Sequence, residues 1–172
     1  MRHTADAWEH GLSAAMDHDV HEARHVMRGA TARRSLLRTA HQHLERCSTT
    51  PGHIQARSAS PLTVVDDLTR INRLLDQLSQ SVIATPDGAA PDDQERADID
   101  AARRIGSRRL WYFAEAMPRP AIDREYIAAG HDLLDALADL ADRAPTRGST
   151  SDVCLALMIS LVETSRHVTR IA

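Results

Sequence analysis

Apolar side chains recur at steps of three and four along most of the chain, which is the spacing of one face of an α-helix. The clearest case follows Pro61, where the apolar positions form a single seam: Leu68, Ile71, Leu75, Leu78 and Val82. Ser60 is placed to cap this helix, and Pro61 suits its first turn because the ring presets a helical φ and needs no hydrogen-bond partner. The pattern therefore predicts a bundle helix that begins at residue 61.

The same spacing predicts six helices and no strand. Their approximate ranges are 5–16, 19–47, 61–83, 91–116, 120–143 and 153–172. Thr4 is the expected cap of the first helix, and the segment 84–93, with two Pro and one Gly, is the expected linker. The last helix is apolar nearly all round over 153–162, so we expect it to be central.

The chain also repeats itself at an interval of about 100 residues. Two segments carry Met, an acid, a β-branched residue and Gly at matching positions: AAMDHDVHEARHVMRG at 14–29 and EAMPRPAIDREYIAAG at 115–130. We therefore expect an all-α protein of two tandem three-helix repeats that form antiparallel bundles. The repeats would span 1–84 and 91–172, with 85–90 as the linker within one compact unit.

Composition narrows the class of protein. Aromatic residues make up only 3% of the chain, which favours helix packing over a β-sandwich, and the net charge of −3 offers no general field for nucleic acid. Cys47 and Cys154 fall within helical patterns and are predicted to be buried thiols. The longest apolar run, 154–162, is too short to cross a bilayer, and no signal peptide precedes it, so we expect a cytoplasmic soluble protein with no membrane insertion.

Three strings together resemble the PhoU family of phosphate-uptake regulators. They are AAMDHDVHEARHVMRG, the Pro-started SASPLTVVDDLTRINRLLDQLSQSVI and the ending LVETSRHVTRIA. The resemblance implies two three-helix repeats and a regulatory adaptor without catalysis. Such proteins restrain a phosphate ABC transporter and act on a membrane sensor histidine kinase, so these are the expected partners.

The chain departs from the family at the acidic pairs that hold metal in some members. The first acidic pair of the family corresponds to Asn72 and Asp76 in this chain. The second pair corresponds to Val162 and Arg166, and His167 follows directly. One carboxylate and one amide hold a divalent ion weakly at best, and Arg166 would repel a cation. We therefore expect no cofactor, with a weakly bound divalent metal as the alternative.

Other polar clusters leave two interpretations open. His18, His21, Glu22 and His25 have helical spacing that suits either a metal site or a solvated face, and the solvated face is favoured. Glu163 and His167 could ligate a metal, although a hydrogen-bonded contact at the helix end is favoured. The acidic stripe at 66–76 is expected to form ion pairs with Arg70 and Arg73 within its own helix. The RRIGSRR run at 103–109 is expected to form a solvated face, and the alternative is a basic patch that meets an acidic partner, a phosphate or nucleic acid.

The first helix is shorter than its counterpart in the family, which should expose apolar residues on its neighbours. Val26, Met27 and Leu37 are therefore the candidate partner-binding residues, for a homodimer or a hetero-complex. No phosphate loop, nucleophile elbow or paired Cys motif is present, so we do not expect an enzyme. A metal-binding bundle of hemerythrin or ferritin type is the alternative, and a nucleic-acid-binding regulator is a more distant one.

Overall fold

The computed structural model describes residues 1–48, 61–85, 91–116, 135 and 149–171. All the regular elements in this part of the chain are helices: α1 (Arg2–Asp17), α2 (Val20–Ser48), α3 (Pro61–Ala84), α4 (Asp93–Ala116) and α7 (Ser149–Ile171). The all-α prediction is thus confirmed, and the start of the third helix at Pro61 is as the sequence predicts. The helix expected over 120–143 lies outside the described residues, apart from Asp135.

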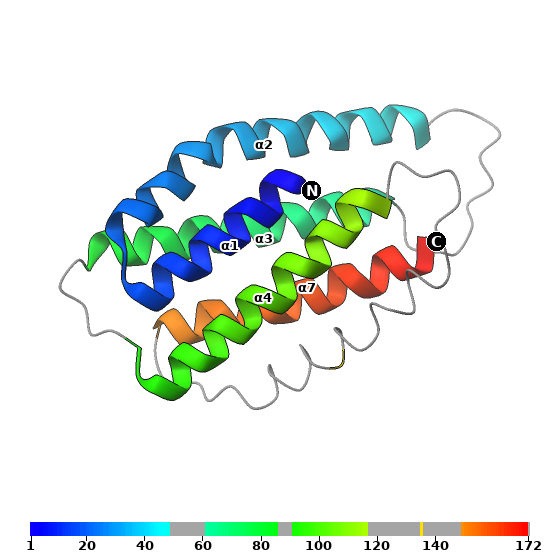
Figure 1. Cartoon of the computed structure of the whole chain (residues 1–172). Coiled ribbons are helices and arrows are strands. Elements are labelled where there is room, and N and C mark those ends of the chain that lie inside the picture. Colours follow the sequence, from blue (N-terminus) through cyan, green and yellow to red (C-terminus); the bar gives the residue numbers. More distant parts are fainter. Residues whose placement is uncertain (49–60, 86–90, 117–134, 136–148, 172) are drawn as a thin grey trace.

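Helices α1 and α2 are joined by a tight reversal at residues 18 and 19. His18 adopts a left-handed conformation with φ of 52°, and its backbone N–H bonds to the Ala14 carbonyl, which ends α1. The Asp19 carboxylate then accepts hydrogen bonds from the His21 and Glu22 amides, so Asp19 caps α2. Because only two residues separate them, α1 and α2 lie against each other in opposite directions (Figure 1).

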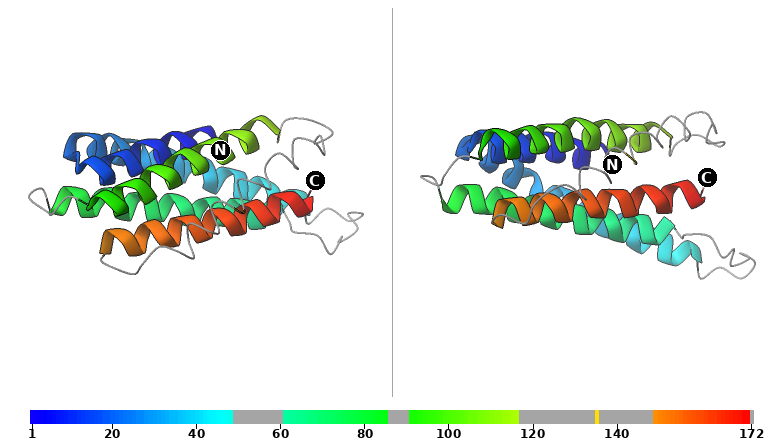
Figure 2. Two further views of the ribbon diagram at one scale, coloured as in Figure 1. Left: turned by 60° about the horizontal axis from the view of Figure 1, so that its bottom comes forward. Right: turned by 90° about the horizontal axis from the view of Figure 1, so that it is seen from below.

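The described helices pack in two layers. Helix α1 lies on α4 and helix α3 lies on α7, while α2 packs along α3 and α1 at one side (Figure 2). The contacts α1–α4 and α3–α7 both join residues before the predicted linker to residues after it. The two superimposable three-helix repeats remain a prediction, since residues 117–134 are outside the described part.

Trp8 and Gly106 fix the contact between α1 and α4. The Trp8 side chain is fully buried, its indole N–H donates to the Ala102 carbonyl at 3.1 Å, and its ring lies directly over Gly106. A Cβ atom at residue 106 would overlap the ring, so only glycine leaves room for Trp8 here. Helix α1 is otherwise rich in small residues, and half of its residues are buried.

The expected Thr4 cap is wrong, because Thr4 is already inside α1. The Thr4 and Ala5 amides bond to the Met1 carbonyl, so the helix begins one turn earlier than the apolar pattern indicates. Thr4 is instead buried and faces α3. The first helix is thus a core element of the bundle, with half of its residues buried.

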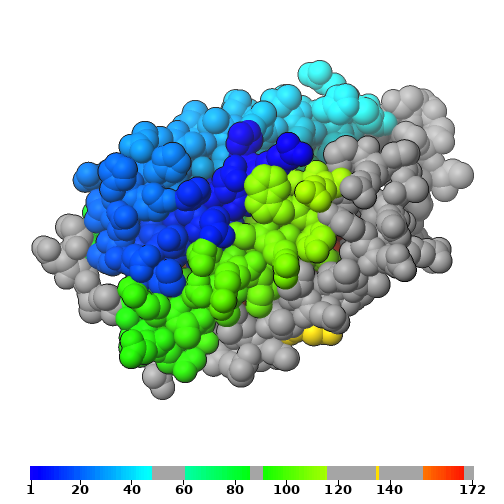
Figure 3. Space-filling view, in the orientation of Figure 1, coloured from blue at the N-terminus to red at the C-terminus, as the bar shows by residue number. Residues whose placement is uncertain are grey.

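Helix α2 is much longer than α1, with 29 residues against 16. At 1.5 Å per residue, α2 extends ~20 Å past the start of α1. Figures 1 and 3 show this far half of α2 running along the upper edge of the molecule, beyond α1. The far half packs against α3 and leaves Leu36 55% exposed.

The two cysteines differ in environment. Cys154 is buried, as predicted, and desolvation raises the pKa of its thiol to about 12. Cys47 is exposed, contrary to prediction, because it lies near the end of α2 where few elements cover the helix. None of the described helices has the length and apolar character needed to span a bilayer.

We predict that Gly106→Ala destabilises the protein by about 2 kcal/mol, because the new methyl group displaces the buried indole. In an open helix the same change is stabilising by up to about 1 kcal/mol, so a loss isolates the clash. Urea unfolding of the variant measures it. Adding Trp8→Phe should recover part of the loss in the double variant, since the smaller ring vacates the space. Equal or higher stability for Gly106→Ala alone would contradict the packing.

A buried ion pair and a polar groove between helices α2 and α3

Asp76, one of the predicted metal ligands, forms a buried ion pair. Arg33 from α2 donates through Nη2 to Asp76 Oδ1 at 2.8 Å and through Nη1 to the Val26 carbonyl at 2.9 Å. The other carboxylate oxygen of Asp76 faces Arg34 Nε at 3.8 Å. Desolvation lowers the pKa of Arg33, and the charge of Asp76 acts in the opposite direction. A metal ion at Asp76 would therefore have to displace a guanidinium group.

Asn72, the other residue of this predicted pair, connects α3 to α1. Its side-chain amide is 1% exposed and donates to Thr4 Oγ1 at 2.9 Å and to the Leu68 carbonyl at 2.8 Å. Three buried polar atoms nearby have no hydrogen-bond partner: Asn72 Oδ1, Arg33 Nε and Ser79 Oγ. The hydrogen bonds of Asn72 and of Asp76 thus connect α3 to α1 and to α2, and breaking either would leave further buried polar groups unpaired.

Glu163 and His167 each pair with a different residue of α3 at the contact between α3 and α7. Arg70 Nη1 donates to Glu163 Oε2 at 3.0 Å, and the His167 ring lies 2.6 Å from Asp67 Oδ2. Both α7 residues thus pair across to α3, in the hydrogen-bonded contacts that the sequence favours. Arg166 is exposed, and Val162 is buried in the core.

The histidines at the start of α2 do not converge. His18 contacts the Thr85 carbonyl and His21 is exposed, while Glu22 pairs with His10 of α1. The His25 ring meets the His10 ring edge-on, with centroids 5.6 Å apart. Among the described residues, no three His, Cys, Asp or Glu side chains are grouped so that they could hold a metal ion. His10 was missed at the sequence level because its partners come from another helix.

A small cavity nevertheless brings several of these groups together. His3, Asp6 and His10 of α1 and His25 of α2 line a space of about 190 Å³. Its inner wall includes the buried Arg33. The cavity could admit a water molecule or a small ion.

The basic run 103–109 is largely engaged within the bundle. Arg103 pairs with Glu9 of α1 and with Asp100, and Arg104 pairs with Asp100 at 3.2 Å. The hydrogen bond from Arg103 lowers the pKa of Asp100. Arg109 is buried, with its guanidinium 4.6 Å from the Phe113 ring centroid. Arg103 and Arg109 therefore help to hold α4 in place, whereas Arg104 and Arg108 are exposed, as expected for the solvated face that the sequence favours.

The candidate partner-binding residues are less exposed than expected. Val26 is 2% exposed and belongs to the core, because α1 covers it. Met27 and Leu37 are half-buried. On this part of α2 the exposed apolar side chain is Leu36, which the sequence did not single out.

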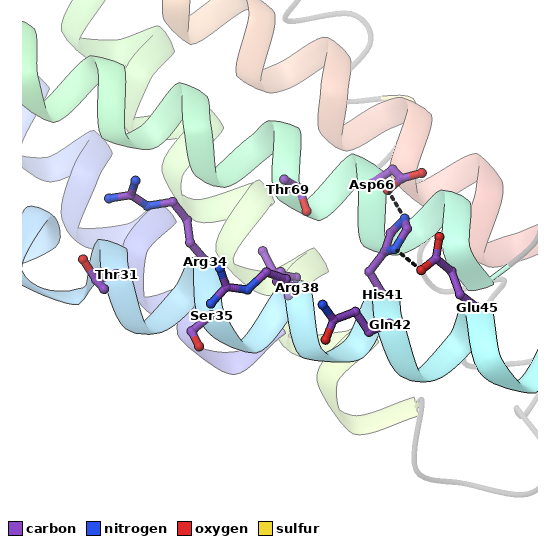
Figure 4. Close-up of a pocket in the computed structure, with 10 residues that line it drawn as sticks. Thr31, Arg34, Ser35, Arg38, His41, Gln42, Glu45, Asp66 and Thr69 are labelled. Carbon is purple, nitrogen blue, oxygen red and sulfur yellow. Dashed lines mark ion pairs between the residues drawn. The ribbon is translucent and has the colours of Figure 1, made fainter.

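A groove of about 730 Å³ lies between the far half of α2 and α3 (Figure 4). Arg34 and Arg38 line its α2 wall and Thr69 its α3 wall, with hydroxyl groups from Thr31 and Ser35. Farther along, His41 stands between Asp66 at 3.3 Å and Glu45 at 3.5 Å. The sequence could not reveal this groove, because its residues form an ordinary polar helix face until α3 is placed beside them.

Comparison with known proteins adds no relative: no family model, curated protein or solved structure matches this chain.

We predict that Asp76→Asn lowers the free energy of unfolding by about 3 to 5 kcal/mol, because it leaves the Arg33 charge buried without its counter-ion. Thermal or urea unfolding measures the loss. Asp66→Asn is the matched control on the same helix, and its side chain is 64% exposed, so it should change stability by less than about 1 kcal/mol. Equal losses of unfolding free energy in the two variants would show that the Arg33–Asp76 pair contributes no more to stability than an exposed carboxylate does.

Proposed function

We propose that this protein is a cytoplasmic, non-catalytic adaptor of the PhoU type. In this role it restrains phosphate uptake and phosphate-starvation signalling through contacts with a membrane sensor histidine kinase and a phosphate ABC transporter. The observation that carries the proposal is the far half of α2, which extends past α1 and presents the α2–α3 groove. An extended helix with an exposed groove offers a contact surface without a catalytic centre.

The internal pairing of the core supports a binding role over a metal-dependent one. At the positions where the family carries metal-binding acids, Asp76 holds Arg33 and Asn72 holds Thr4. Those side chains stabilise the bundle and leave recognition to the surface. A homodimer through α2 remains part of the proposal, with Leu36, Leu37 and Met27 as its apolar contacts, since Val26 is buried.

The second candidate is a helical-bundle metal protein of the hemerythrin or ferritin type. The cavity lined by His3, Asp6, His10 and His25 is the observation that favours it, because imidazole and carboxylate groups suit iron, zinc and manganese. In the described structure no three of these side chains are grouped closely enough to hold an ion, so metal binding would require them to move together. Its four side chains come from two helices only, whereas bundle metal sites usually draw ligands from three or four.

Deleting the gene should release a phosphate-repressed reporter in phosphate-replete cells, because the adaptor would no longer restrain the kinase. Alkaline phosphatase activity measures the release, and wild-type protein should restore repression. A photo-crosslinking amino acid at Ser35, in the groove, should capture the kinase or transporter in replete cells. The same group at Arg104, exposed on α4, is the control. An unchanged reporter after deletion would refute the adaptor proposal.

Chelation should leave the melting temperature of the purified, untagged protein unchanged, because the bundle is held by its own ion pairs and apolar core. Differential scanning fluorimetry with and without EDTA measures this. A loss of several degrees, restored by iron, zinc or manganese, would favour the metal protein instead. In that case His25→Ala should abolish the restoration, whereas His43→Ala, exposed and outside the cavity, should not.

A further inference from the structure

The α2 wall of the groove carries two arginines whose charges are poorly compensated. Within the described part of the chain, Arg38 makes no hydrogen bond or ion pair, and Figure 4 shows its guanidinium lying along α2 beside Ser35. Arg34 donates through Nε to the Ala30 carbonyl at 3.3 Å and approaches Asp76 only at 3.8 Å, where Arg33 already takes the other carboxylate oxygen at 2.8 Å. Residues 34 and 38 are one helical turn apart, so both guanidinium groups can face one ligand.

The acidic groups of the groove do not balance these arginines. Asp66 and Glu45 lie farther along, where the two ring nitrogens of His41 approach one carboxylate each. Figure 4 shows His41 standing between them, away from the arginine end. The groove is therefore locally cationic at one end, although the whole chain carries a net charge of −3.

The size and lining of the groove indicate the kind of ligand. A volume of about 730 Å³ exceeds that of a single oxyanion and lies within the range of pockets that hold larger ligands. The Thr31 and Ser35 hydroxyls can donate to carboxylate oxygens, as the arginines do, whereas the Thr69 hydroxyl already donates to the Val65 carbonyl at 2.8 Å. Leu37 in the lining and the neighbouring exposed Leu36 offer apolar contacts. A peptide segment with both acidic and apolar side chains matches all of these features.

We propose that the groove between α2 and α3 binds an acidic segment of a partner protein, with Arg34 and Arg38 holding two of its carboxylates one helical turn apart. The inference rests on the proposed function, since it defines the chemistry by which the adaptor recognises its partner. A guanidinium group meets a carboxylate in a planar, two-point contact that other cations do not reproduce, so the arginine pair confers geometry as well as attraction.

The test uses the full-length protein and a fluorescent peptide. The peptide is an alanine-based helix of about 15 residues, a length at which such helices begin to form in water, with glutamates paired four residues apart and one leucine. Fluorescence anisotropy at fixed ionic strength measures binding. Arg38→Gln should weaken binding about fivefold, the usual worth of one partly exposed ion pair. The double variant Arg34→Gln/Arg38→Gln should weaken it further.

The matched control is Arg24→Gln, which removes the same charge from an exposed position of α2 outside the groove. It should leave binding unchanged, and the glutamine version of the peptide should not bind. Equal weakening by Arg24→Gln and Arg38→Gln would reduce the effect to general electrostatics and overturn the proposal. Tight binding of inorganic phosphate alone, lost in Arg38→Gln, would likewise overturn it in favour of an oxyanion site.

This experiment is independent of the cellular test of the proposed function. Deletion could leave the phosphate reporter unchanged while Arg38→Gln still weakens peptide binding. That result would support the groove as a binding site for acidic segments and would refute the proposed role in phosphate regulation. If the reporter responds and the groove variants bind the peptide as wild type does, the adaptor uses another surface. Circular dichroism melting of each variant confirms that the exposed substitutions leave the bundle folded.

Discussion

Asp76 links the interior of this bundle to its proposed binding surface. One carboxylate oxygen accepts a hydrogen bond from the buried Arg33, and the other faces Arg34 at the edge of the groove. Two unpaired charges in a core would cost several kcal/mol, so a slip of α2 along α3 by one turn is strongly disfavoured. The pair therefore sets the register of the two helices. That register decides which α2 side chains face α3 and hence what the groove contains.

The remaining helices are held by contacts of a different kind. Helix α4 is fixed by the fit of Trp8 over Gly106, where the absence of a side chain is the determining feature. Helix α7 contacts α3 through two polar pairs, but Arg70 and Glu163 are about half exposed and such pairs contribute little. The buried Leu157 and Leu161 supply most of the stability of that contact. Neither of these two contacts involves a charge on the far half of α2.

The sequence predicts the helices well because each one carries its own periodic pattern. The Leu68–Val82 seam and Pro61 define α3 without reference to any neighbour, and all five seam residues are buried. Predictions fail where burial depends on another helix. Thr4 has the chemistry of a cap, but α3 supplies Asn72 as its partner inside the bundle. Val26 was expected to be exposed because α1 was expected to be short, and α1 in fact covers it.

The candidate site was less predictable than the fold for the same reason. Asn72 and Asp76 were chosen because they fall on an acidic pair of the resembled family, and Glu163 and His167 were chosen by their spacing within one helix. Their contacts come from other helices, namely α1, α2 and α3. Gly106 could have been noticed, because a glycine within a helical pattern costs about 1 kcal/mol and usually has a packing reason. The groove left no comparable signal. Polar residues on an exposed helix face are expected everywhere, and only the position of α3 separates Arg38 from any other surface arginine.

The separation of core and groove has a consequence for how such a protein can change partners. Arg34 and Arg38 are exposed and contribute little to folding, so replacing them alters recognition at small cost in stability. Arg33, one residue away on the same helix, is fixed by the core. Adjacent positions of α2 are therefore under different constraints: folding fixes residue 33, whereas residue 34 is free to serve the proposed binding. A bundle of this design can keep one structure while the charges along its exposed helix change.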